Sequence, residues 1–370
     1  MKNNWLYELD ENILNFLNSL RSKEKNYQFF PSANGATKAG KTISLGFSCF
    51  ALKTYYITGL WEDLKEIEKR NWLNFINSFQ DNNSKFPKNS FLDYCYIQEF
   101  EKEQRKKIIK NSAKFISTKI GYKKFEPPFQ QMKTNIRAES KQAISSLIQV
   151  GSRNSLPYLD FPRNRSEIYK FLNDLDWNKP WSAGAQYAGI CLFSKTQNET
   201  NPNVFDNLIQ FSNKIVKKDT GGYYLQNTPD KKELINGAMK MISGFDWIDQ
   251  EIHYPEKLID LCLDTSPSSE GCDLVDIVYV LFMCLKQTDY KKREIINYFD
   301  EIINLIQLHY FKEKFGFSYF KNKSQTHYYG VNITRGKNLP DIHGTVLLTW
   351  ALSMIIKTNN INLKWNILKP

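Results

Sequence analysis

The chain has 370 residues, of which 41% are hydrophobic and 14% aromatic, a composition typical of a folded protein rather than a disordered one. Its net charge is +11, but basic residues alternate with Glu, as in residues 101–107, which indicates solvated helix faces rather than a nucleic-acid-binding stripe. No apolar run reaches the ~18 residues of a membrane span, and no signal peptide is evident, so we expect a cytoplasmic protein.

Most of the chain shows apolar residues at the three-to-four spacing of amphipathic helices, with charged residues between them. In chain order these predicted helices cover residues 9–22, 59–79, 98–119, 137–150, 166–174, 203–217, 255–263 and 291–313. Each of them is expected to have one wet face and one buried face.

A second type of predicted helix is shorter and apolar on most sides, which indicates burial. These helices are expected to begin at about residues 44, 140, 182, 234, 271 and 341. Because amphipathic helices and apolar helices alternate along the chain, we expect two concentric layers of helices in one domain, residues 1–370. Gly-aromatic segments at 221–224 and 316–320 predict short strands or ordered turns, and residues 120–136 predict an internal loop.

Residues 35–42 match the written phosphate-loop pattern G-x-x-x-x-G-K-[ST]. A phosphate loop requires a strand that feeds it within a parallel sheet, and no such pattern follows. The favoured interpretation is a loop that precedes a core helix. The six Cys and four His residues form no spaced cluster, so neither a metal site nor a cofactor is expected.

The segment from Asp341 to Thr345 places polar residues at the start of an apolar helix. Asp341 is a favourable N-cap, because helix N-termini carry free N–H groups and partial positive charge. His343 is the strongest candidate for an acid or base at the mouth of a cavity. The alternative is a helix cap followed by a core histidine.

Asp273 and Asp276 lie three residues apart on a predicted buried helix, and hence on one face. Two neighbouring buried carboxylates repel each other, which raises the pKa of one and suits it to act as an acid. Together with His343 and Asp341 they form the predicted catalytic set. The alternative interpretation is a helix cap and an internal hydrogen bond.

Five further residues are predicted to contact substrate. Tyr279 follows Asp276 on the same helix face, and Trp350 lies further along the helix that begins near 341. His327, Tyr329 and Arg335 belong to a loop that could cover the cavity and bind a polar or anionic ligand. Alternatively, the aromatic residues of this loop cover the rim of the core.

The alternating layers, the Gly-aromatic turns and two motif helices resemble an (α/α)6 toroid, the fold of terpenoid cyclases and of protein prenyltransferase β subunits. Residues 274–276 resemble the prenyltransferase helix that carries a zinc-binding Asp, and residues 339–345 resemble the segment that carries the zinc-binding His. The position of the Cys ligand is occupied by Val278, so the resemblance implies the fold without the zinc.

The resemblance implies a double-layered helical barrel with a central cavity. We expect a metal-independent enzyme that uses acid–base chemistry on a prenyl or other small, possibly anionic substrate. Similar toroids also serve glycan lyases and hydrolases, which would show an open cleft with exposed aromatic platforms. A non-catalytic binding or assembly protein would instead have a plugged cavity and an apolar outer patch.

Overall fold

The computed structural model describes residues 4–82, 85–107, 127–197, 203–267 and 270–370. Its described part is mostly helical, as the all-α prediction requires. No helix within these ranges is both long and apolar enough to cross a membrane. All six cysteines are free thiols, four of them buried.

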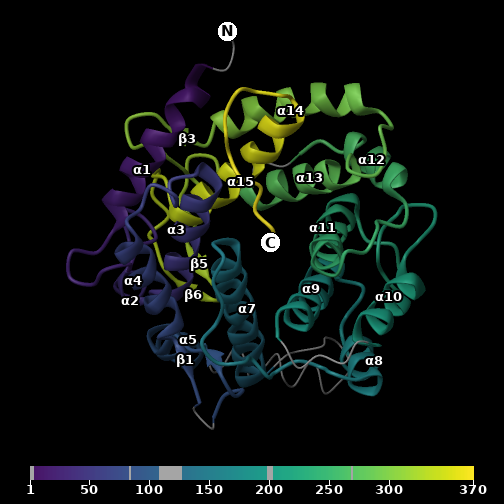
Figure 1. The fold of residues 1–370 in the computed structure, drawn as a ribbon, viewed down its shortest axis with the longest axis horizontal. Coiled ribbons are helices and arrows are strands. Elements are labelled where there is room, and N and C mark those ends of the chain that lie inside the picture. Colours follow the sequence, from purple (N-terminus) through teal and green to yellow (C-terminus); the bar gives the residue numbers. More distant parts are fainter. Residues whose placement is uncertain (1–3, 83–84, 108–126, 198–202, 268–269) are drawn as a thin grey trace.

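Six helices, most of them strongly apolar, surround the centre of the molecule, and each contacts the next in chain order until the last packs against the first (Figure 1). They are α3 (Leu45–Thr58), α7 (Pro128–Gln149), α9 (Pro180–Thr196), α11 (Lys231–Ile248), α13 (Gly271–Cys284) and α15 (Ile342–Thr358). Five of the six begin close to the predicted residues. Nearly every residue of α3, α13 and α15 is buried, because neighbours pack on most sides of these helices.

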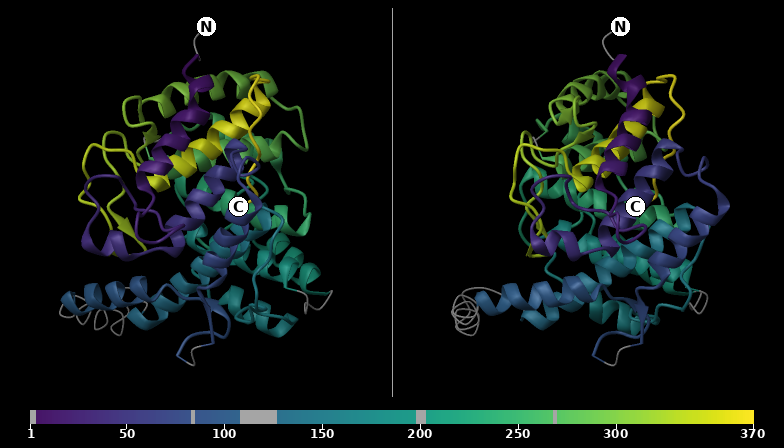
Figure 2. Two further views of the ribbon diagram at one scale, coloured as in Figure 1. Left: turned by 60° about the vertical axis from the view of Figure 1, so that its left-hand side comes forward. Right: turned by 90° about the vertical axis from the view of Figure 1, so that its left-hand side faces the viewer.

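The amphipathic helices lie outside this group (Figure 1). They are α1 (Leu9–Leu20), α4 (Glu66–Asn77), α5 (Tyr94–Lys106), α8 (Arg165–Asn173), α10 (Asn203–Ile215), α12 (Pro255–Leu263) and α14 (Lys292–Gln307). Helix α14 shows the principle: its buried residues lie on one face at the spacing of an amphipathic helix, namely Ile295, Phe299, Ile302, Ile303 and Ile306. Figure 2 shows α1 and α15, from opposite ends of the sequence, packed side by side.

The strands of the described segments form three antiparallel hairpins of two-residue strands. These are β1 (Gln80–Asp81) with β2 (Ser90–Phe91), β3 (Tyr310–Phe311) with β4 (Gly316–Phe317), and β5 (His327–Tyr328) with β6 (Val331–Asn332). Both predicted Gly-aromatic turns are confirmed as ordered features, since Gly316–Phe317 is β4 and Tyr223 bridges Val216. A 3-10 helix, Asn4–Glu8, and the short α2, Lys38–Thr42, complete the elements.

The predicted loop at 120–136 is wrong from residue 128 onward. Residues 120–126 lie outside the described part of the chain, but α7 begins at Pro128, twelve residues before the predicted start at 140. Proline is favoured in the first turn of a helix, because its missing N–H has no partner there. The Pro127-Pro128 pair therefore marks the beginning of a helix rather than a break.

The phosphate-loop pattern at residues 35–42 adopts a different structure from a nucleotide-binding loop. Thr37 caps α2 by accepting a hydrogen bond from the Gly40 N–H at 2.9 Å. A Cβ on Gly40 would lie 2.1 Å from the carbonyl oxygen of Ile333, so this glycine serves a close backbone contact. All strand pairs in the described segments are antiparallel, and α2 leads directly into the core helix α3.

Candidate functional site

Helix α15 begins with a fully engaged carboxylate. Asp341 accepts hydrogen bonds from the backbone N–H groups of Gly344 and Tyr319, both at 2.8 Å, and of Gln325 at 3.0 Å. Burial raises the pKa of Asp341 to about 6, against the opposing effect of these N–H donors. The Asp341 side chain thus connects the first turn of α15 to two loop segments. This structural role is separate from the catalytic role predicted for it.

Gly344 allows this helix start to lie against the preceding loop. A Cβ at this position would be 2.3 Å from the Tyr319 nitrogen and 2.4 Å from the Ser318 carbonyl carbon. Next to it, the Thr345 hydroxyl donates to the Asp341 carbonyl at 2.8 Å. The glycine between His343 and Thr345 is therefore explained by a backbone contact.

His343 is held between two aromatic rings. Its ring stacks on Phe50 with centroids 4.6 Å apart and on Tyr319 with centroids 5.2 Å apart. Its Nδ1 lies 2.9 Å from the side-chain oxygen of Gln325. With the proton on Nδ1 that contact is a hydrogen bond, and Nε2 keeps a lone pair that can accept a proton.

A cavity of ≈240 Å³ lies among α3, α7, α9, α11 and α15, and His343 is part of its wall. Four basic side chains line it: Lys53, Arg137, Lys141 and Lys240. None of the described residues that line it is Asp or Glu. Other lining residues are aromatic, apolar or neutral polar, namely Phe50, Gln142, Ser145, Gln186, Met239, Tyr329, Val346, Leu347, Trp350, Leu368 and Pro370, with Ala138, Ala185 and Gly189.

The three lysines of this cavity form no ion pair within the described residues, although Glu139 and Asp276 interact electrostatically with Lys53 and Lys240, respectively. Arg137 forms an ion pair with Asp160 at 3.0 Å. By contrast, Lys53, Lys141 and Lys240 form no ion pair with any residue in the described segments, although Lys240 lies 5.9 Å above the Trp181 ring. Such unpaired cations are costly to bury, so the cavity favours an incoming anion.

The electrostatics of the cavity reflect this excess of positive charge. Burial lowers the pKa of Lys53 to about 8, against the opposing effects of Cys49 and Glu139 and with a smaller contribution from the charge of Lys240. Burial, followed by the charges of Lys240 and Lys53, lowers the pKa of Lys141 to about 7. Burial, followed by the charges of Lys240 and Lys53, lowers the pKa of His343 to about 3. The imidazole is therefore neutral near pH 7, and its proton affinity would rise only when an anion enters the cavity and offsets the lysine charges.

The predicted carboxylate pair belongs to α13 and does not line the cavity. Asp273 pairs with Lys232 at 2.7 Å and accepts a hydrogen bond from Asn236 at 3.0 Å. Asp276 is buried, its Oδ2 has no hydrogen-bond partner among the described residues, and burial raises its pKa to about 6. The structure thus places one carboxylate in an ion pair and the other outside the cavity lining, where the charge of Lys240 partly opposes the rise in its pKa.

The predicted substrate-contacting residues are divided between the cavity and other places. Tyr329 and Trp350 line the cavity. Tyr279 packs against Trp350 with ring centroids 5.3 Å apart but lies behind it, fully buried. His327 and Arg335 are exposed on the loop and are not among the lining residues.

A buried acid that the sequence did not single out lies close to this loop. Tyr328, on β5, donates a hydrogen bond to Glu139 of α7. Burial raises the pKa of Glu139 to about 8, against the opposing effect of that hydrogen bond. A Cβ on Gly46 would overlap the Tyr328 hydroxyl at 2.0 Å, so α3 packs tightly on this pair and the arrangement is structural.

The structure therefore brings together three of the predicted site residues, His343, Tyr329 and Trp350. The cavity wall also contains four basic residues that were not predicted from the sequence: Lys53, Arg137, Lys141 and Lys240. Two of these carry a recognisable signal, because Lys53 and Lys240 are isolated charges inside apolar helices. A charge in such a place is a candidate for function, since it cannot be explained by a solvated helix face.

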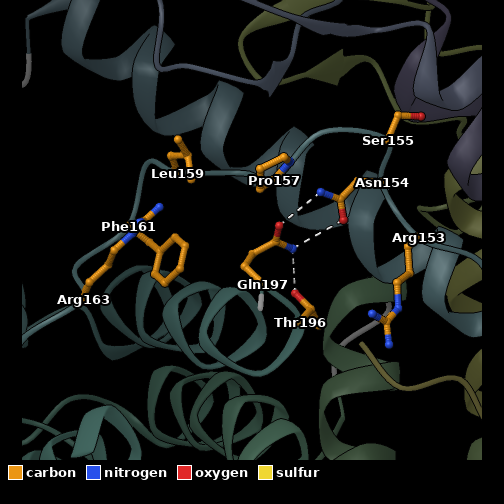
Figure 3. A pocket seen from close by; sticks show the side chains of 9 residues that line it. All are labelled: Arg153, Asn154, Ser155, Pro157, Leu159, Phe161, Arg163, Thr196 and Gln197. Carbon is orange, nitrogen blue, oxygen red and sulfur yellow. Dashed lines mark hydrogen bonds between the residues drawn. The ribbon is translucent and has the colours of Figure 1, made fainter. Parts of the chain in front are cut away.

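A second pocket, of ≈300 Å³, lies between the segment 153–163 and the end of α9 (Figure 3). Its polar groups engage one another. Gln197 accepts from the Asn154 amide at 3.1 Å and from the Tyr158 N–H at 2.9 Å, and donates to Thr196 at 3.0 Å. Because its amides are already bonded, this pocket is a weaker candidate than the central cavity.

Within the described segments, no three His, Cys, Asp or Glu residues lie close enough together to hold a metal ion. No protein-family model, no curated protein and no solved structure matches the chain. The geometry of the cavity is therefore the basis for a functional assignment.

Proposed function

We propose that the chain is a metal-independent enzyme that binds a small anionic substrate in its central cavity and acts on it by acid–base chemistry. The proposed architecture is an (α/α)6 toroid, with α3, α7, α9, α11, α13 and α15 as the inner helices. The cyclic order of their contacts supports this architecture. The observation that carries the functional proposal is a cavity wall with three unpaired lysines and no acidic side chain.

The substrate is proposed to combine an anionic head with an apolar part. Lys53 and Lys240 would bind the head, since ammonium groups form charge-assisted hydrogen bonds with phosphate or carboxylate oxygens, and Lys141 lines the same cavity. Phe50 and Trp350 would contact the apolar part. A short prenyl diphosphate has this chemistry.

His343 is the proposed base. Its neutral ring is oriented by Gln325 and by stacking, so Nε2 can accept a proton from a substrate held by the lysines. Among the described residues its contacts are aromatic rings and an amide. These neighbours fit an acid–base group better than a metal ligand.

Binding is tested by the thermal stability of the protein with pyrophosphate, with dimethylallyl diphosphate and with the neutral dimethylallyl alcohol. Both diphosphates are expected to raise Tm, and the alcohol is not. Lys240→Met should weaken pyrophosphate binding about tenfold or more, because a charge-assisted hydrogen bond is lost. The matched control is Lys218→Met, which removes an exposed lysine remote from the cavity lining.

Equal loss of binding in both variants, or no stabilisation by either diphosphate, would overturn the proposal. Stabilisation by a neutral oligosaccharide alone would favour the glycan-active alternative. Catalysis is tested by product formation from dimethylallyl diphosphate, with and without a chelator, in wild type and His343→Ala. Turnover that is unaffected by His343→Ala, or abolished by the chelator, would contradict the proposed chemistry.

A further inference from the structure

Lys141 is placed differently from the other lysines of the cavity. It lies near the middle of α7, where Arg137, Lys141 and Ser145 follow at four-residue spacing and all line the cavity. Residues at this spacing share one helix face. The side chain is partly buried and forms no ion pair with any other residue that the structure describes.

The α9 wall of the cavity includes two small residues. Helix α9 contributes Ala185, Gln186 and Gly189 to the lining, and a Cβ on Gly189 would meet only Phe193, at 3.7 Å. There is thus no close backbone contact that requires a glycine here. The absence of a larger side chain leaves room for a small molecule next to the amine.

We propose that Lys141 is a nucleophile that forms an imine with the carbonyl carbon of a small anionic substrate. This inference rests on the proposed function, because Lys53 and Lys240 would hold the anionic group of the same molecule. Suitable substrates contain an aldehyde or ketone close to a carboxylate or a phosphate. The inference therefore narrows the small anionic substrate to a carbonyl compound and assigns a covalent step, while a prenyl diphosphate, which has no carbonyl group, would bind without reacting at Lys141.

The chemical step balances without an oxidant or reductant. The Nζ lone pair attacks the carbonyl carbon and the C=O π bond becomes an alkoxide. The nitrogen loses one proton, the oxygen takes up two in all, and the C–O bond breaks to release water as the C=N bond forms. The second proton comes from the ammonium group of Lys240 or from water in the cavity, and the product is a protonated imine.

Only the neutral amine can make this attack, and the surroundings of Lys141 favour it. An ordinary lysine, with a pKa near 10.4, is neutral in roughly one molecule in 2,500 at pH 7. Burial, reinforced by Lys240 and Lys53, lowers the pKa of Lys141 to about 7, so about half of these side chains are neutral at that pH. Cys191, its thiol neighbour, has a raised pKa and stays uncharged.

The test is reductive trapping of the full-length protein at pH 7 with sodium borohydride. One arm uses pyruvate and the other dihydroxyacetone phosphate, which separates a carboxylate from a phosphate as the anionic group. Peptide mapping by mass spectrometry locates the adduct. Labelling of Lys141 is expected to exceed that of an ordinary lysine by up to about a thousandfold, given neutral fractions of about one half and roughly one in 2,500, and exposed Lys218 serves as the comparison.

Lys141→Arg keeps the positive charge but cannot form an imine. It should abolish trapping while pyrophosphate still raises Tm. Mapping on the wild type requires no variant, so it remains informative if Lys141→Arg fails to fold. Uniform labelling of surface lysines, or an adduct at Lys53 or Lys240 instead, would overturn the inference. Stabilisation by pyrophosphate without any adduct would reject the imine and leave the proposed function standing.

Discussion

The carboxylate of Asp341 is expected to be essential for folding stability, whatever its part in catalysis. Asp341→Ala removes the acceptor of three backbone N–H groups, those of Gly344, Tyr319 and Gln325, at 2.8, 2.8 and 3.0 Å. Each buried donor that loses its partner costs about 1–3 kcal/mol, and these effects are not fully additive. We therefore expect the free energy of unfolding to fall by about 3–5 kcal/mol.

The assay is urea unfolding followed by circular dichroism at pH 7.5, above the pKa of Asp341, where wild-type Asp341 is mostly ionised. A positive comparison is Asp93→Ala, since Asp93 accepts from the N–H groups of Ser44, Leu45, Cys95 and Tyr96. The control is Asp219→Ala, an exposed loop residue expected to change stability by less than about 0.5 kcal/mol. If Asp341→Ala unfolds like this control but loses activity, the structural explanation is refuted and the catalytic prediction gains support.

Two further outcomes are expected from substitutions in and around the cavity. Gly344→Ala should lower the free energy of unfolding in urea by more than about 2 kcal/mol, because its Cβ would overlap the preceding loop. Gly189→Ala has room for a Cβ and should lower it by less than about 1 kcal/mol. Equal losses in the two variants would contradict the close contact at Gly344. Because Lys141 has a lowered pKa in the folded state, the unfolded chain binds more protons between pH 7 and about 10, and wild-type stability gains from this group as pH rises. Lys141→Met should therefore have a higher free energy of unfolding than wild type at pH 7 and lose that advantage by pH 10. If the difference in free energy of unfolding between the two proteins is the same at both pH values, the pKa of Lys141 is ordinary.

The sequence predicted the helices well where a single physical signal governed them. Helices α13 and α15 begin within one residue of the predicted starts at 271 and 341, because a largely apolar segment that follows polar residues is stabilised by burial as a helix. Helix α7 was predicted to begin at 140, since its first turns are polar and resemble a loop. Their contacts with α5 and the nearby hairpin become evident only in three dimensions.

The candidate site was predicted less completely, for a related reason. Asp341 and His343 are neighbours in the sequence, so their association with one helix start could be recognised. Lys53, Lys141 and Lys240 come from α3, α7 and α11 and meet only after the inner helices pack. The spacing of residues along the sequence does not predict which side chains from different helices come together. An isolated lysine in an apolar helix nevertheless indicates a functional or structural role for its charge.

The positions of the charges along their helices separate structural from functional residues. Asp341 lies at a helix start, where free N–H groups compensate its charge within the protein. The lysines of the cavity lie in helix interiors, where the backbone N–H and C=O groups are already bonded to each other. No described side chain neutralises them by an ion pair. Their burial is therefore balanced best by a charge from outside the chain, which is why we expect an anionic ligand between them rather than another structural contact.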